Sequence, residues 1–199
     1  MPRPRPALFA AVATVAALPL SAADPLWAGA ASSPHWVALS NPDGGSAAAQ
    51  DAFASALAVE GDTLLVGAPL DDAPGATDAG AAFVFVRQAG QWQFQAKLVP
   101  TDRAAAAQFG HAVALSGDTA LVGAWKQNTA AGSGAGAAYV FVRSGGAWTQ
   151  QAQLLAADAA TGDAFGDAVA LLGDTAVVGA SGDDSESVIN HGSAYVFQR

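Results

Sequence analysis

The side chains with the clearest capacity for chemistry are acidic residues in segments rich in glycine, serine and alanine. Two aspartate pairs stand at equivalent places in the chain, and two further acidic residues follow them closely. Carboxylate oxygens are the ligands that Ca²⁺ prefers, but a calcium shell needs about six to eight of them. The candidate metal ligands are therefore scattered residues rather than a recognisable loop: Asp71, Asp72, Asp78, Asp183, Asp184 and Glu186.

Patterns typical of catalysis are absent from the sequence. His35, His111 and His191 stand at unrelated positions, and no motif marks a nucleophile for a Ser-His-Asp triad. Adjacent carboxylates in one loop do not by themselves lie across a bond as glycoside hydrolysis requires. The glycine-rich stretch 132–136 lacks the lysine and the following helix of a phosphate loop. We expect a protein without enzymatic activity and without a bound cofactor.

Composition excludes further classes of protein. The 199 residues include 8 Lys and Arg against 17 Asp and Glu, a net charge of −9, whereas nucleic-acid binding needs a basic footprint. The absence of cysteine excludes disulfides, thiolate metal sites and a cysteine nucleophile. Alanine supplies much of the 52% hydrophobic content, so the core must pack small side chains closely.

The first 23 residues have the features of a secretory signal peptide. Arg3 and Arg5 precede an apolar run that ends at Leu20, and small residues follow up to Ala23. The run is shorter than a membrane-spanning helix, and no later segment is long enough to span a bilayer. We expect export with cleavage after Ala23, or at Ala30 as a second site, and a leader over residues 24–35.

The remainder of the chain is one unit that recurs three times, over about residues 36–87, 88–143 and 144–199. Gly-Asp-Thr followed by an apolar run and Gly-Ala begins at Gly61, Gly117 and Gly173, always 56 residues apart. Aromatic landmarks keep the same offset without insertion or deletion: Trp36, Trp92 and Trp148; Phe53, Phe109 and Phe165. Such a period is typical of solenoids, propellers and repeat arrays.

Four strand patterns fill one period. We predict strands over 56–59, 63–68, 81–86 and 92–98, with a Gly-Asp hairpin turn between the first two and a polar face on the fourth. The alanine runs 104–107 and 156–160 are too short to form helices alone, and we predict loops there. The fold class is therefore all-β, built from four-stranded antiparallel blades of the β-propeller type.

The repeat resembles the FG-GAP repeat of integrin-α-like β-propellers, in its bacterial form. Phe109-Gly110 followed by Val122-Gly123-Ala124 carries the resemblance, and Ala54, Trp125 and Ser181 are departures from it. The resemblance implies an exported or cell-surface propeller that mediates recognition, often as one module of a larger protein. The positions expected to hold the motif structurally are Phe53, Gly67, Phe109, Gly110, Gly123, Phe165, Gly166 and Gly179, with Trp36, Trp92 and Trp148.

Calcium-binding members of that family carry an Asp-x-Asp/Asn-x-Asp-Gly loop between the first two strands. A bare Gly-Asp turn replaces the loop in all three repeats, so Asp62, Asp118 and Asp174 each stand alone. One carboxylate cannot form a calcium shell, and we assign these residues to turn geometry.

Antiparallel strand order predicts that the long second-to-third loops and the inter-blade connections share one end of the blades. This face would be either an acidic recognition surface, for a cationic partner or a loosely held divalent cation, or a set of loops that keeps the protein soluble. Lys126 and Gln127 interrupt the acidic pattern in the second repeat. The face collects Asp43, Asp51, Asp71, Asp72, Asp78, Asp102, Asp158, Asp163, Asp183, Asp184 and Glu186.

Propellers typically have about four to eight blades, and three repeats fall short of that number. Counting residues 36–39 as the missing outer strand of the last blade gives twelve strands, or three blades. We therefore expect an open three-blade arc, a homodimer that closes a six-bladed ring, or a fragment of a longer gene product. The expected function is a secreted or cell-surface module that recognises a protein or glycan. Two alternatives are an accessory domain or remnant of a larger exported hydrolase and a calcium-stabilised adhesion propeller.

Overall fold

The computed structural model describes residues 38–42, 50–184 and 191–199, and the secondary structure there is entirely β. The first sheet contains β1 (Ala56–Glu60), β2 (Thr63–Ala68), β3 (Ala81–Gln88) and β4 (Gln91–Leu98). The second contains β5 (Ala112–Ser116), β6 (Thr119–Ala124), β7 (Ala137–Ser144) and β8 (Ala147–Leu154). The third contains β9 (Phe165–Leu172), β10 (Thr175–Ala180) and β11 (Ser193–Gln198).

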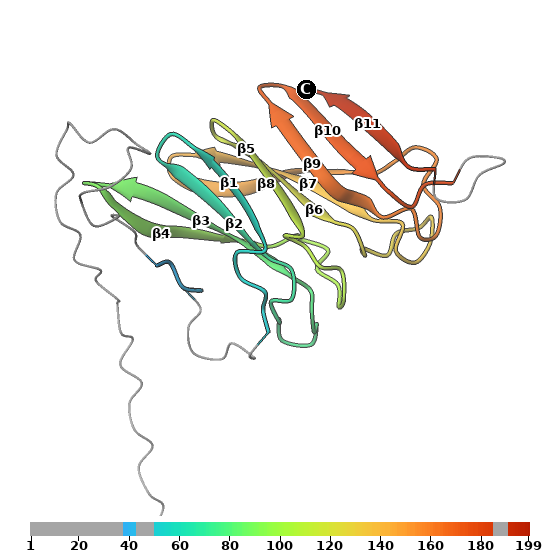
Figure 1. The fold of residues 1–199 in the computed structure, drawn as a ribbon, viewed down its shortest axis with the longest axis horizontal. Coiled ribbons are helices and arrows are strands. Elements are labelled where there is room, and N and C mark those ends of the chain that lie inside the picture. Colours follow the sequence, from blue (N-terminus) through green and yellow to red (C-terminus); the bar gives the residue numbers. More distant parts are fainter. Residues whose placement is uncertain (1–37, 43–49, 185–190) are drawn as a thin grey trace, which may run out of the picture.

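All neighbouring strands are antiparallel, and the three sheets lie one behind another in chain order (Figure 1). The blade-type all-β prediction is therefore confirmed, and both alanine runs are loops as predicted. Within the described residues, no helix has the length and apolar character to cross a bilayer.

The short hairpin turns follow from the Gly-Asp pairs. Gly61, Gly117 and Gly173 have φ angles of 54°, 56° and 56°, in the left-handed region that glycine enters without strain. The aspartate of each turn also accepts a hydrogen bond from the arginine that ends the third strand: Arg87 Nε lies 2.7 Å from Asp62 Oδ1, and Arg143 and Arg199 repeat the pair with Asp118 and Asp174. The turn aspartates thus connect the first hairpin to the third strand, a role beyond turn geometry.

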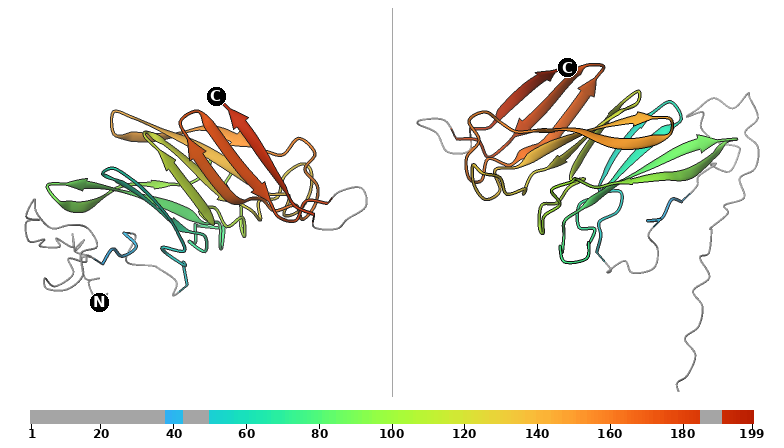
Figure 2. Two further views of the ribbon diagram at one scale, coloured as in Figure 1. Left: turned by 45° about the horizontal axis from the view of Figure 1, so that its top comes forward. Right: turned by 180° about the vertical axis from the view of Figure 1, so that it is seen from behind.

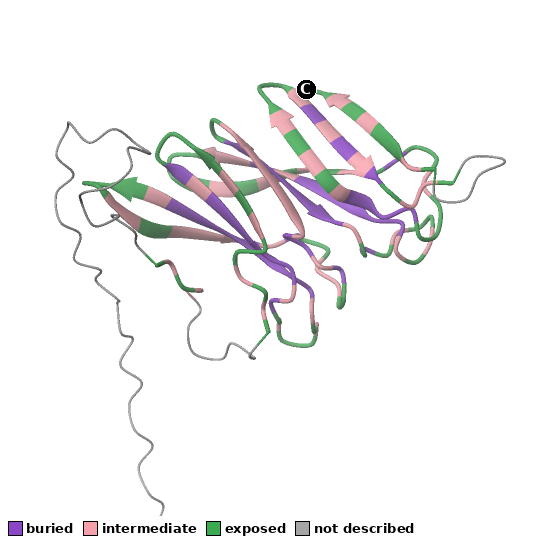
Figure 3. Cartoon of the chain, viewed as in Figure 1, coloured by how far each residue is buried: buried purple, intermediate pink, exposed green. Residues whose placement is uncertain are grey.

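Successive sheets lie face to face (Figure 2). Apolar side chains fill the spaces between them. One cluster joins Leu65 and Val84 of the first sheet to Phe109 and Tyr139 of the second, and another joins the second sheet to Phe165 of the third. Strands β2, β3, β6 and β7 hold most of the buried strand residues (Figure 3). In the third sheet, β10 alternates between buried and partly buried positions, and most of β9 and β11 alternates between partly buried and exposed ones.

The sheets approach most closely at glycine. A Cβ on Gly67 would lie 2.0 Å from the carbonyl oxygen of Gly110, and a Cβ on Gly123 would lie 1.9 Å from that of Gly166. Gly179 occupies the same place in the third sheet, but there a Cβ would meet nothing closer than Ala168, at 3.4 Å. Gly67 with Gly110, and Gly123 with Gly166, therefore form the joints between successive sheets. At Gly179 of the third sheet, the equivalent joint has no partner sheet among the described residues.

The predicted twelfth strand is not found where we placed it. Ala38 and Leu39 are not in a strand, and Leu39 packs against the first sheet, on the face turned away from the second sheet. Trp36 lies outside the described residues. Trp148 packs between the first and second sheets, and Trp92 packs against the outer cluster of the first.

Candidate binding face at the long loops

The long loops 69–80, 125–136 and 181–192 follow β2, β6 and β10, and lie together with the connections between sheets. The described parts of these loops form the lower edge of the molecule in Figure 1, and the β1–β2 turn lies at the opposite end. This is the clustering that the antiparallel order predicted. Asp43 and Glu186 of the predicted acidic face lie outside the described residues.

Asp71 is buried on this face and holds two cations. Its side chain is only 4% exposed, Lys97 Nζ lies 2.8 Å from its Oδ1, and Arg103 NH2 lies 3.1 Å from the same atom. Arg103 also donates to the carbonyl of Gly80, at 3.3 Å. The group connects the loop after β2 with β4 and with the connection to the second sheet, so its role is to hold loops in place.

Asp102 performs a similar role between the first and second sheets. It accepts hydrogen bonds from the hydroxyl of Tyr139 at 3.0 Å, from Gln153 at 3.0 Å and from Gln127 at 3.4 Å. Burial of the hydroxyl, together with the adjacent carboxylate, raises the pKa of Tyr139 well above its usual range. The phenol therefore stays a hydrogen-bond donor to Asp102.

Tyr195 repeats this arrangement one period later. Its hydroxyl donates to Asp158 Oδ1 at 2.8 Å and lies 3.0 Å from Asp183 Oδ2. Burial raises the pKa of Tyr195, and the two carboxylates raise it further. Two of the predicted acidic residues thus share one hydroxyl group.

The remaining predicted acids divide into buried and exposed side chains. Asp163 is buried and accepts the backbone N–H of Ala160, while Asp51 accepts from the amide of Asn41 at 3.1 Å. Asp72 is exposed, and its carboxylate receives the backbone N–H of Asp78 at 2.9 Å. Asp184 is exposed beside Asp183. Within the part of the chain that the structure describes, no three acidic or histidine side chains gather closely enough to hold a metal ion.

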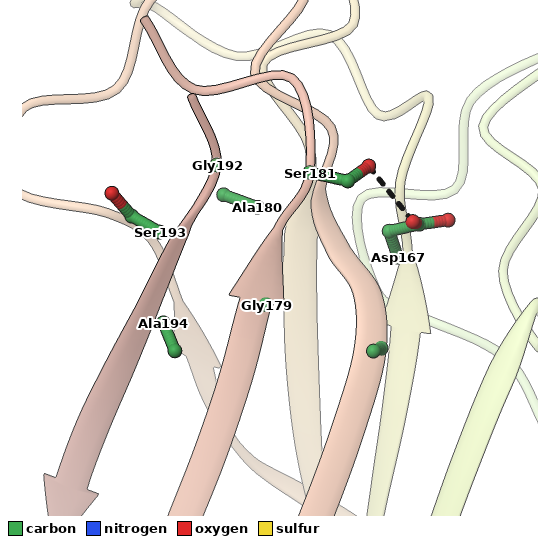
Figure 4. A pocket seen from close by; sticks show the side chains of 8 residues that line it. Asp167, Gly179, Ala180, Ser181, Gly192, Ser193 and Ala194 are labelled. Carbon is green, nitrogen blue, oxygen red and sulfur yellow. Dashed lines mark hydrogen bonds between the residues drawn. The ribbon is translucent and has the colours of Figure 1, made fainter. Parts of the chain in front are cut away.

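A histidine, an aspartate and a serine meet at the joint between the second and third sheets. His111 Nε2 lies 3.1 Å from Asp167 Oδ1, and Ser181 Oγ donates to Asp167 Oδ2 at 2.8 Å (Figure 4). A catalytic triad places the histidine between the nucleophile and the acid. Here the carboxylate is in the middle and accepts the hydrogen bond of the serine hydroxyl itself, so this order does not prepare a nucleophile.

A family model for the FG-GAP repeat matches residues 42–85, 92–141 and 148–197, which is more than half of the chain. The chain belongs to the FG-GAP repeat family. A search of curated proteins finds no match. The second and third FG-GAP matches each begin in the fourth strand of one sheet and end in the third strand of the next. One FG-GAP repeat therefore consists of the fourth strand of one sheet and the first three strands of the next sheet.

Sequence reasoning missed the polar groups that position the FG-GAP loops. The sequence patterns gave no role to Tyr139 and Tyr195, nor to Lys97, Arg103 and Gln153. A signal was present in the 56-residue register, because Asp102 and Asp158 are equivalent positions, as are Asp71, Gln127 and Asp183. Polar side chains that recur in register with a tyrosine indicate a repeated hydrogen-bonding group.

Proposed function

We propose that the chain is an exported, non-enzymatic FG-GAP module that recognises a cationic protein segment through its long-loop face. Four exposed carboxylates on this face carry the proposal: Asp72, Asp102, Asp158 and Asp184. Loops held on a rigid β frame are a common place for binding residues.

Three basic side chains of the same face stand against the nine acidic residues that the structure describes there. Lys97 and Arg103 both pair with the buried Asp71, and Lys126 lies over the ring of Trp125 at 4.6 Å. A lysine-rich or arginine-rich segment would therefore meet a surface with a negative field, which favours encounter at low ionic strength.

The proposal is tested with a synthetic decalysine peptide and two variants of equal charge. Asp72→Asn with Asp184→Asn removes two of the four exposed negative charges from the long-loop face, and Asp62→Asn with Asp118→Asn removes two negative charges from the opposite end. We expect the first variant to bind about 3- to 10-fold more weakly than the wild type, since exposed ion pairs contribute up to about 1 kcal/mol each. The control variant should keep wild-type affinity. Equal losses in both variants would mean that net charge, and not this face, determines binding.

Export is proposed from the basic start, the apolar run and Ala23. It predicts that the secreted chain begins at Asp24, which N-terminal sequencing of the protein recovered from culture medium or periplasm would show. Recovery of the chain in the cytosol with its N-terminus intact would contradict export.

A further inference from the structure

A cavity of about 260 Å³ lies between the second and third sheets, at the end where the short turns are. Apolar side chains, among them Leu154, Leu171 and Phe197, form its walls. Polar residues also line it, among them Gln151, Asp174 and Arg199, and Arg199 pairs with Asp174 at 2.7 Å. The side chain of Gln151 makes no hydrogen bond to any other residue that the structure describes.

The equivalent place between the first and second sheets holds an indole ring. Trp148 packs against the cluster between these sheets, its Nε1 donates to Gln95 at 2.9 Å, and the guanidinium of Arg143 lies 5.2 Å from its ring centroid. Gln151 and Arg199 are the residues one period after Gln95 and Arg143. The cavity therefore presents the acceptor and the cation that an indole would require.

The strand that would deliver this indole is missing from the third sheet. Trp148 belongs to β8, which pairs with β7, whereas β11 has no fourth strand beside it in residues 38–42, 50–184 and 191–199. Val196 on β11 is 69% exposed. An unpaired strand edge with an exposed apolar side chain is a template for another extended segment.

Residues 36–42 of the chain have the sequence register of that strand. Trp36 precedes Phe53 by 17 residues, as Trp92 precedes Phe109 and Trp148 precedes Phe165. The second and third FG-GAP matches begin in the fourth strand of the preceding sheet, and residues 36–42 stand at the equivalent place before the first sheet, where the described residues form no preceding sheet.

The same molecule cannot bring Trp36 to the cavity. Leu39 packs on the outer face of the first sheet, and three extended residues reach about 10 Å. The third sheet lies two sheet spacings away, about 20 Å. We propose that residues 36–42 of a second copy of this chain pair with β11 as the fourth strand of the third sheet, and that its Trp36 fills the cavity between Gln151 and Arg199. A two-fold axis makes the two joints equivalent and closes a ring of six sheets.

The same contact places the second copy's Phe53-Ala54 against a groove of about 380 Å³ on the third sheet, lined by Gly179, Ser181 and Gly192 (Figure 4). Gly110 and Gly166 fill the equivalent grooves within the chain, and a Cβ on Gly110 would lie 2.3 Å from the carbonyl oxygen of Ala81. Ala54 carries that Cβ, so the joint between copies is wider here than the internal ones. The cavity that receives Trp36 then supplies most of the specificity of the contact. This inference does not depend on the proposed ligand of the long-loop face.

Light scattering of the full mature chain tests the proposal. We expect twice the chain mass at micromolar concentration, and Trp36→Ala should weaken association by about 30-fold or more, as expected for a buried anchor residue. Trp27→Ala, which removes a tryptophan outside the repeat register, should leave association unchanged. A wild-type monomer, or a Trp36→Ala chain that dimerises as well as the wild type, would overturn the proposal.

Engineered cysteines provide a second readout that does not depend on affinity, because the chain has no cysteine of its own. The pairs Val86–Gln93 and Val142–Thr149 are opposite each other in the internal sheets, so Gln198 should lie opposite Val37 of the second copy. Chains with Gln198→Cys and Val37→Cys together should form a disulfide-linked dimer under mild oxidation, while an intramolecular disulfide or no disulfide would contradict the contact. Chains with Gln198→Cys alone should remain monomeric in denaturant.

Discussion

The carbonyl oxygen of Gly110 occupies the space where a side chain on Gly67 would begin, 2.0 Å from the position of its Cβ. Gly123 and Gly166 have the same relationship one period later, at 1.9 Å. In both pairs the obstacle is backbone, which cannot move aside as the end of a long side chain can. Close packing of successive sheets therefore depends on the absence of a side chain at Gly67 and Gly123.

This relationship predicts a graded response to one substitution at three equivalent positions. Gly67→Ala and Gly123→Ala should each destabilise the protein by about 3 kcal/mol or more, because the added methyl group forces two sheets apart. Gly179→Ala should leave stability unchanged or raise it by up to about 1 kcal/mol, because its φ is accessible to alanine and no sheet formed by the described residues lies against it. Urea denaturation under dilute conditions measures all three. Equal losses of stability at the three positions would show that glycine is needed within each strand and not for packing between sheets.

The buried carboxylate of Asp71 predicts a second stability effect. Asp71→Asn leaves Lys97 and Arg103 without their shared anion, and we expect a loss of about 1–3 kcal/mol. The matched control is Asp118→Asn, where the carboxylate is 64% exposed and also pairs with one arginine. Because exposed pairs contribute little, that variant should lose less than about 1 kcal/mol. Thermal or urea unfolding of the two variants compares them, and the reverse order would contradict the role given to Asp71.

Tyr139→Phe removes one hydroxyl without changing the ring, and Phe83 shows that the first repeat uses phenylalanine at this position. The variant loses the hydrogen bond to Asp102, and we expect destabilisation of about 1–2 kcal/mol. Hydrogen exchange of the backbone amides near Asp102 should accelerate with it. An unchanged unfolding midpoint would mean that water replaces the hydroxyl at no cost.

Asp51 predicts a dependence of stability on pH. Burial, and then the negative charge of Asp71, raise the pKa of the Asp51 carboxyl above 3.8. Since the folded state disfavours the ionised form, the contribution of Asp51 is favourable below pH 3.8 and is lost as pH rises through the raised pKa. Asp51→Asn should therefore raise the melting temperature at pH 7. This gain should disappear as the pH falls below 3.8. A gain that grows on acidification would contradict the sign.

The sequence was sufficient to predict the blade-type fold because its signals are local and recur in register. The Gly-Asp turns, the apolar runs before Gly67 and Gly123, and the alternation in β8 each specify a strand or a turn without reference to distant residues. The placement of residues 36–39 could not be obtained in this way. Their pattern shows that they resemble an outer strand, but which sheet they join depends on the position of Leu39, which packs against the first sheet.

The character of the acidic face was also only partly predictable. The sequence places eleven acidic residues there, but burial and pairing depend on contacts between loops far apart in the chain. Asp71 meets Arg103 across 32 residues, and Asp102 meets Tyr139 across 37. The carboxylates that hold loops together could be separated from those that face solvent only once these contacts were known.

Mapping the contact surface of a cationic peptide by ¹⁵N NMR tests the recognition role of the long-loop face most directly. On titration with decalysine, we predict amide shifts confined to the loops after β2, β6 and β10 and to the connections between sheets. These shifts should vanish at about 1 M salt, where charges are screened within about 3 Å. Shifts centred on the turns at Asp62, Asp118 and Asp174, or no shifts at millimolar peptide, would contradict recognition of cationic segments by the long-loop face.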